Sequence, residues 1–310
     1  MIGRDTPAHS LTGQTITITG GAGFIGSRLA ATLAPDNDVR ILDDLSTGTA
    51  RNVPDEATLI EGDVRTSTTV GKALDGADLV FHEAANPSVS RSIDAPLESH
   101  SRNVEGTLTV LEAARSDAAR VVTASSTAVY GTPETVPVAE DADLNPSSPY
   151  GLEKLTADRY TQLYNDLYDL PTVSLRYFNV YGPGQTGGDY SGVISIFLEQ
   201  ATADEPITVD GDGQQTRDFV HVDDVIRANI AAATTEATGE AFNVGTGTSV
   251  TITELAETIR ELTDADSEIE YVDSRPGDIR HSRADLSKAS RLLDYAPEIG
   301  LEDGLRTLLE

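Results

Sequence analysis

The chain has 310 residues, a formal net charge of −29 and no cysteine. The lack of cysteine excludes disulfide bonds, thiolate nucleophiles and cysteine-ligated metals, and the excess of acid argues against nucleic acid as a partner, because phosphate binding needs basic patches. An acidic chain whose cations are mostly arginine is typical of a salt-loving organism, where salt screens the self-repulsion of the charges.

The first 14 residues lack the apolar core of a signal peptide. No apolar run approaches the roughly 20 residues that span a bilayer. We therefore expect a soluble, cytoplasmic protein with no membrane partner, folded as one or two domains.

Short β-branched runs alternate with helical patterns through the first half of the chain. The runs predict strands at residues 15–19, 39–42, 59–61, 79–81, 121–124 and 173–176. Helices are predicted between them, at residues 24–33, 70–74, 97–115 and 148–167. Alternating helices and strands of the buried type predict an α/β fold with a doubly wound parallel sheet, the Rossmann arrangement.

After residue 177 the pattern loosens into glycine-rich loops, with helices predicted at 193–202, 222–234, 252–262 and 301–309. We assign residues 1–177 to the Rossmann domain and 178–310 mainly to a smaller mixed α/β lobe. Residues near 218–245 are expected to return to the first domain. The lobe should close over the carboxyl ends of the strands, where ligands bind in such sheets.

A glycine-rich loop, residues 20–26, joins the first predicted strand to the first predicted helix. Gly20 permits the tight turn, Gly23 lets a pyrophosphate approach backbone N–H groups, and Gly26 allows helix and strand to pack closely. A purely structural turn is the alternative. The strand before the loop and the helix after it favour dinucleotide binding.

Acids at the ends of the second and third strands extend this predicted cofactor site. Asp43, followed by Asp44, lies where a carboxylate can accept the ribose hydroxyls and repel a 2′-phosphate, which favours NAD over NADP. Asp63 and Val64 follow the third strand, where they would serve the adenine end or form a plain turn.

Tyr150 and Lys154 are the most informative pair, because Lys154 is one of only three lysines in the chain. Four residues apart on a predicted helix, the two side chains share a face. The ammonium, together with the positive nicotinamide ring, would lower the pKa of the phenol and make it a base near neutral pH. The alternative is an exposed surface pair.

Ser126, after the fifth strand, would hydrogen-bond Tyr150 and a substrate hydroxyl, or only cap a turn.

Three loop residues beyond the first domain are candidates for substrate binding: Asn179, Arg217 and Arg275. Arginine binds diphosphates bidentately, although surface ion pairing would explain either arginine alone. Asp223 and Asp224 after His221 could suggest a metal site. We favour a helix start there, because acids suit the first turn of the helix predicted at 222–234, and we expect no metal.

In chain order, these motifs resemble those of the extended short-chain dehydrogenase/reductases, and within them the NAD-dependent nucleotide-sugar epimerases. The resemblance runs from about residue 15 to the C-terminus and rests on residues 19–26, 126, 150–154, 176–182, 215–224, 242–247 and 275–278. It implies that Tyr150 takes the proton of the sugar 4-hydroxyl while hydride passes from C4 to NAD. Ser126 would steady that hydroxyl, and Lys154 would hold the nicotinamide ribose. Further expected cofactor contacts are Phe24, Ile25, Ala84 and Tyr177.

Departures from related patterns narrow the implied activity to a UDP-hexose 4-epimerase. Nucleotide-sugar 4,6-dehydratases carry Asp-Glu after the position of Ser126, whereas this chain has Thr127 and Ala128. Ser282 stands where a bulky tyrosine restricts relatives to glucose and galactose, so the resemblance implies that UDP-GlcNAc and UDP-GalNAc are accepted beside UDP-Glc and UDP-Gal. Asp278, in the same segment, is a further expected substrate contact.

Other readings stay open from the sequence alone. Another NAD-linked nucleotide-sugar enzyme, such as a UDP-glucuronate epimerase or decarboxylase, is one alternative, and a non-catalytic redox-sensing relative is another. The resemblance also implies a homodimer, in which the helices predicted at 97–115 and 148–167 form a four-helix bundle.

Overall fold

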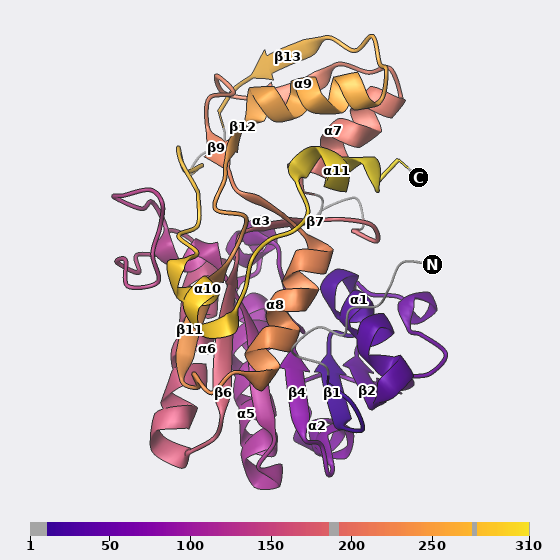
Figure 1. The fold of residues 1–310 in the computed structure, drawn as a ribbon, viewed down its shortest axis with the longest axis vertical. Helices are drawn as coiled ribbons and strands as arrows, with labels where there is room; N and C mark the ends of the chain where they lie inside the picture. Colours follow the sequence, from indigo (N-terminus) through magenta and orange to yellow (C-terminus); the bar gives the residue numbers. More distant parts are fainter. Residues whose placement is uncertain (1–10, 186–191, 275–277, 310) are drawn as a thin grey trace.

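A seven-stranded parallel sheet forms the centre of the computed structural model (Figure 1), which describes residues 11–185, 192–274 and 278–309. The strands lie in the order β11-β6-β5-β4-β1-β2-β3, and each pairs in parallel with its neighbours. Their bounds are β1 Thr15–Thr19, β2 Asp38–Asp43, β3 Thr58–Glu61, β4 Leu79–His82, β5 Arg120–Ser126, β6 Thr172–Tyr177 and β11 Glu240–Val244. The predicted doubly wound α/β fold is confirmed.

Helices cover both faces of this sheet because its strands bury side chains on both sides. On one face, α1 (Phe24–Leu33) and α8 (Val222–Thr234) pack on a core that includes Ile16, Ile18 and Ile41. On the other, α2 (Ser67–Leu74), α5 (Gly106–Asp117) and α6 (Pro149–Tyr168) pack on Leu42, Val80 and Val121. The strand order reverses between β1 and β4, and this switch point opens a crevice at the carboxyl edge.

A smaller lobe lies beyond the carboxyl edge of the sheet (Figure 1). Its own apolar core joins α7 (Val193–Thr202), β8 (Ile207–Asp210), α9 (Ile252–Leu262), β13 (Ile269–Val272) and α11 (Leu301–Arg306). Three two-stranded pairs complete it: β13 with β8, β9 (Thr216–Arg217) with β12 (Val250–Thr251), and β10 (Phe219–His221) with β7 (Asn179–Tyr181). The last helix before α11, α10 (Ser287–Leu293), returns to pack beside β11.

The helix predicted at 97–115 is wrong as a single element. Residue Pro96 begins a separate short helix, α4 (Pro96–His100), followed by π-helical turns (Ser101–Glu105) that lead into α5. An unpredicted helix, α3 (Val89–Asp94), precedes α4 and is capped by Ser88, whose Oγ accepts from the N–H of Arg91 at 3.2 Å. Such short turns lack the repeated apolar spacing by which a helix is recognised in a sequence.

Other bounds differ by a turn or less, and several strands were not predicted. The helix predicted at 70–74 starts at Ser67, and the one predicted at 301–309 ends at Arg306. Strands β7 to β13 had no prediction, because most have two to five residues and too little alternation to be recognised. The remaining single turns are 3₁₀-helical, at Ala34–Asp36, Ala50–Asn52 and Thr127–Tyr130.

The start of α8 is a helix cap, as predicted. His221 is the N-cap residue, and its Nδ1 accepts from the N–H of Asp223 at 3.2 Å. Asp224 is fully buried and accepts from the N–H of Glu298 at 2.8 Å. Within the described ranges, no His, Asp and Glu residues are grouped as metal ligands would be, and no helix is long and apolar enough to cross a membrane.

Candidate active site

A pocket of about 310 Å³ opens at the switch point of the sheet. Gly20 follows β1 with a φ of +70°, and a Cβ there would lie 2.7 Å from the backbone N of Ala84. A Cβ on Gly26 would collide with the carbonyl oxygen of Gly20. Gly23 is the N-cap of α1 and offers no side chain to the first turn, so the free N–H groups of the helix face the crevice. The loop is thus shaped for close approach of a phosphate.

The structure brings every residue predicted for the cofactor to the wall of this one pocket. These residues are Gly20, Gly23, Phe24, Ile25, Gly26, Asp43, Asp44, Asp63, Val64, Ala84, Tyr150, Lys154 and Tyr177. They come from the ends of β1, β2, β3, β4 and β6 and from α1 and α6. The adjacency follows from the parallel sheet, whose carboxyl ends share an edge.

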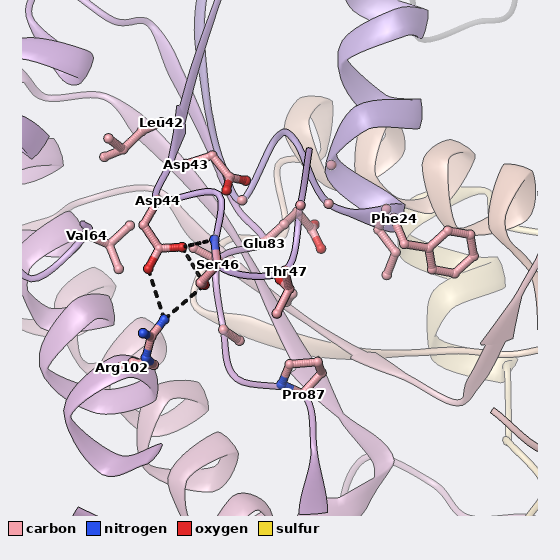
Figure 2. Close-up of a pocket in the computed structure, with 18 of the residues that line it drawn as sticks. Phe24, Leu42, Asp43, Asp44, Ser46, Thr47, Val64, Glu83, Pro87 and Arg102 are labelled. Atoms are coloured by element: carbon pink, nitrogen blue, oxygen red, sulfur yellow. Dashed lines mark hydrogen bonds and ion pairs between the residues drawn. The ribbon is translucent and has the colours of Figure 1, made fainter. Parts of the chain in front are cut away.

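Two aspartates at the end of β2 fix the part of the pocket expected to hold the ribose. Asp43 is buried, and its two oxygens accept from the N–H groups of Ala22 at 2.9 Å and Leu45 at 2.8 Å. Asp44 is half-buried, and burial alone would raise its pKa. Hydrogen bonds from Ser46 and the ion pair with Arg102 at 2.9 Å outweigh burial and lower the pKa of Asp44 (Figure 2). The lowered pKa keeps Asp44 anionic where a 2′-phosphate would be repelled.

The part of the pocket predicted for the adenine also contains a carboxylate with a lowered pKa. Asp63 accepts a hydrogen bond and ion pair from Arg65, which lowers the pKa of Asp63. Val64 lies beside it in the pocket wall (Figure 2). A glycine cradle that a Cβ would fill, followed by carboxylates at the ribose position, fits a dinucleotide without a 2′-phosphate.

Tyr150 and Lys154 lie in the first turns of α6, which begins at Pro149 after the N-cap Ser148. The Oγ of Ser148 accepts from the N–H of Gly151 at 3.0 Å, and the Oγ of Ser92 accepts from the N–H of Tyr150 at 3.1 Å. Lys154 is 7 % exposed, so the alternative of an exposed surface pair is wrong. The helix is thus anchored where its catalytic candidates face the pocket.

The ammonium of Lys154 donates to the carbonyl oxygen of Ala124 at 2.9 Å. Burial lowers the pKa of Lys154 to about 8, against the raising effect of Glu83 and Glu153. A lysine with such a pKa is still mostly protonated at neutral pH, and the nearby acids oppose its desolvation.

The protein groups around Tyr150 together do not lower the pKa of its phenol, and the part of the predicted lowering assigned to the nicotinamide ring stays a prediction. Burial raises the pKa of Tyr150, a hydrogen bond with Ser126 opposes this, and Glu153 adds to the increase. Desolvation of the phenolate in this buried position is the largest of these effects. Ser126 also accepts from the N–H of Ala128 at 3.2 Å, so it caps a turn and hydrogen-bonds Tyr150 as well.

Of the residues predicted for the substrate, Tyr150 lines this pocket, whereas Ser126, Asn179, Arg217, Asp278 and Ser282 do not. Asn179, in β7, donates to the carbonyl of Asp218 at 3.0 Å. Arg217 pairs with Asp278, which is the ion pairing that the sequence left open as an alternative. Ser282 is buried beside β9, where its N–H donates to Thr216 at 3.2 Å. Arg275 lies outside the described residues.

Two charged residues in the pocket wall were not predicted. Glu83 directly follows β4, so the sequence could have predicted its position at the carboxyl edge of the sheet. Arg102 comes from the π-helical segment and reaches Asp44 across 58 residues of chain. Nothing local in the sequence indicates that contact.

This sheet and this site together define a class of α/β enzymes that bind a dinucleotide at the carboxyl edge. The sequence pattern of the NAD dependent epimerase/dehydratase family matches residues 16–245. The chain is 38 % identical to the UDP-glucose 4-epimerase of Mycolicibacterium smegmatis over 302 residues, which cover 94 % of this chain and 96 % of that relative.

Solved structures of named epimerases have the same fold as this chain. The UDP-glucose 4-epimerase of Thermotoga maritima, solved with UDP-glucose, superposes with a TM-score of 0.91 at 35 % identity, covering 94 % of this chain and 96 % of that one. The UDP-N-acetylglucosamine 4-epimerase of Methanobrevibacter ruminantium superposes with a TM-score of 0.92 at 35 % identity, covering 96 % and 97 %. The chain belongs to the NAD dependent epimerase/dehydratase family, and its cofactor is NAD.

The glycine loop generates a direct prediction. Gly26→Ala should displace the loop at Gly20 and weaken NAD binding by about tenfold or more, a loss of at least ~1.4 kcal/mol. Bound NAD is measured after gel filtration by release and absorbance. The matched control is Gly71→Ala in α2, where an added Cβ meets nothing within 4 Å, and where replacing a helical glycine should stabilise the fold by about 0.5–1 kcal/mol. Equal NAD content in both variants would contradict the role of Gly26.

Proposed function

We propose that this protein is an NAD-dependent 4-epimerase of UDP-hexoses. The observation that carries the proposal is the grouping of three residues: Tyr150 and Lys154 line the NAD pocket, and Ser126 hydrogen-bonds Tyr150. Thr127 and Ala128 follow Ser126, so the acid pair of the dehydratases is missing at that place. The named activities of two similar proteins, both 4-epimerases, support the same reaction.

In the proposed reaction, Tyr150 takes the proton of the sugar 4-hydroxyl and later returns it. Ser126 hydrogen-bonds both that hydroxyl and Tyr150, so the proton donor and its acceptor are held in a fixed orientation. NAD, when bound, supplies a hydride acceptor and donor, so the sugar is oxidised at C4 and then reduced on its other face. Lys154 keeps positive charge beside the phenol, which favours the phenolate form that must exist after deprotonation.

The nucleotide diphosphate would bind in the second lobe. The guanidinium of Arg217 pairs with Asp278 through Nη2 and donates from Nη1 to the carbonyl oxygen of Thr216 at 2.7 Å. Arginine offers a planar fork to a diphosphate, which would compete with Asp278 for it. Asn179 and Arg275 complete the proposed contacts. A firm hold on the diphosphate leaves the sugar free to turn over, which epimerisation at C4 requires.

The decisive experiment follows C4 epimers from a panel of UDP-, GDP- and dTDP-sugars, incubated in concentrated salt without added cofactor. UDP-glucose or UDP-N-acetylglucosamine should be converted, because NAD is regenerated in each cycle. Tyr150→Phe should lower kcat about 10²–10⁴-fold, the usual contribution of a general base, and should retain bound NAD. Decarboxylation or C5 epimerisation of a UDP-uronate in place of C4 epimers would overturn the proposal, as would full activity of Tyr150→Phe.

We further propose that N-acetylated hexoses are substrates, on the basis of Ser282. A small side chain there would leave space for the acetamido group, and the similar archaeal enzyme is named for UDP-N-acetylglucosamine. Ser282→Tyr should lower kcat/KM for UDP-GlcNAc about 100-fold or more relative to UDP-Glc, within the range that a filled pocket gives. Ser290→Tyr, on the exposed side of α10, should leave the ratio unchanged. If Ser282→Tyr lost activity on UDP-GlcNAc and UDP-Glc to the same extent, Ser282 would not select between the two sugars.

We propose a homodimer formed through α4 to α6. Leu97 is 87 % exposed, Leu152 57 % and Leu167 62 %, on helices that pack beside one another. Large apolar side chains gathered on one face of an otherwise acidic protein favour an interface. The relatives' four-helix bundle, implied by the resemblance, would bury this face.

Leu97→Glu should therefore shift the protein from dimer to monomer in sedimentation velocity, since it places a charge in the proposed bundle. Leu309→Glu is the matched control, because Leu309 is an exposed leucine (41 %) that follows α11 in the smaller lobe. The control should sediment like the unchanged protein. A monomer without any substitution, or a Leu97→Glu dimer of unchanged stability, would refute the bundle.

A further inference from the structure

We propose that Glu83 is a positioning residue for catalysis, a fixed counter-charge that keeps the ammonium of Lys154 protonated beside NAD. The inference rests on the role proposed for Lys154 and not on which sugar is bound. Glu83 has no part in the reaction as described above, and it lies in the wall of the NAD pocket (Figure 2).

The register of the sheet places Glu83 next to the anchor of Lys154. His82 of β4 pairs with Thr123 of β5, so the next residues, Glu83 and Ala124, lie side by side at the carboxyl edge. Ala124 is the residue whose carbonyl oxygen accepts from Lys154 Nζ at 2.9 Å. The carboxyl of Glu83 and the ammonium of Lys154 thus both lie in this part of the pocket wall, where the carboxylate acts on the ammonium through its charge.

Two hydrogen bonds hold the carboxyl of Glu83 in place. The hydroxyl of Tyr177, at the end of β6, donates to Glu83 Oε1 at 2.8 Å. Asn229 of α8 in turn donates from Nδ2 to the hydroxyl of Tyr177 at 2.8 Å. The chain of donors ends on the carboxyl oxygen, which favours its ionised form.

The other ionisable groups near Lys154 are engaged elsewhere. Glu153 accepts from Ser99 and Asn103, each at 2.7 Å, and Asp158 pairs with Arg176 at 2.9 Å. His82 is held by Thr19 and Thr107, and burial lowers the pKa of its imidazole to about 3, so it is neutral. Tyr150 is a neutral phenol in the resting site. Of the two acids that raise the pKa of Lys154, Glu83 and Glu153, only Glu83 lines the cofactor pocket.

The two groups titrate as a pair. Burial raises the pKa of Glu83 to about 7, against the lowering effects of Tyr177 and Lys154, while Lys154 has a pKa of about 8. The carboxylate raises the pKa of Lys154, so its removal lets burial depress that pKa further. Both groups are charged together between these values, where the ammonium is available to the phenol, and the measured inflections belong to the pair.

The scarcity of lysine makes the test direct. Lysine labelled with ¹³C at Cε gives three signals in this chain, from Lys72, Lys154 and Lys288, and Lys72→Arg and Lys288→Arg assign them. In the NAD-loaded protein, Glu83→Gln should lower the pH of the Lys154 inflection by about one unit or more, the effect of losing an adjacent opposite charge. No turnover is needed, so the result is independent of the proposed substrate.

Glu240→Gln is the matched control, because Glu240 pairs with Lys288 at 2.7 Å. It should move the Lys288 signal and leave Lys154 unchanged. An unchanged Lys154 inflection in folded Glu83→Gln overturns the proposal. If that variant does not fold, the unsubstituted protein decides: the Lys154 signal should show a second inflection from ionisation of Glu83, and a single inflection overturns the proposal.

Discussion

The polar inner face of α6 is the constraint on which the site depends. Most side chains that this helix buries are polar, so each needs a hydrogen-bond partner, and several find one in the sheet. Lys154 donates to Ala124, Asp158 accepts from Ser125 and Arg176, and Thr161 donates to Thr123. These bonds cannot be satisfied after a slip of one residue. They fix the rotation and register of α6, and with them the position of Tyr150 at the pocket wall.

The same constraint explains why a lysine stands at position 154 in a chain that otherwise uses arginine. The ammonium bonds a single backbone carbonyl, and in the proposed reaction it must also present charge to the phenol and the ribose. A planar guanidinium has five donors in a rigid fork and cannot satisfy them against one carbonyl. The ammonium is also the group whose pKa burial can shift into the neutral range, so its charge becomes sensitive to the acids around it.

Sequence reasoning reached the features that are local and missed those that depend on contacts between distant segments. The glycine loop, the strand ends with Asp43 and Asp63, and the spacing of Tyr150 and Lys154 are all readable within a few residues. The direction of the Tyr150 pKa was not readable, because it depends on how deeply the folded site buries the phenol. The pairing of Arg102 with Asp44 and of Arg217 with Asp278 spans 58 and 61 residues, and a local pattern carries no such information.

Helix α6 is amphipathic in the reverse of the usual sense. Its buried face is mostly polar, while Leu152, Leu163 and Leu167 follow one another along the outer face, 43–62 % exposed. Both faces of the helix carry a free-energy cost in the monomer. The polar side chains of the inner face lose their hydration, and the leucines of the outer face stay in contact with water. A second copy packed on the outer leucines would remove one of the two costs. The proposed dimer would thereby stabilise the helix that holds Tyr150 and Lys154, which couples assembly to the geometry of the site although the two surfaces do not meet.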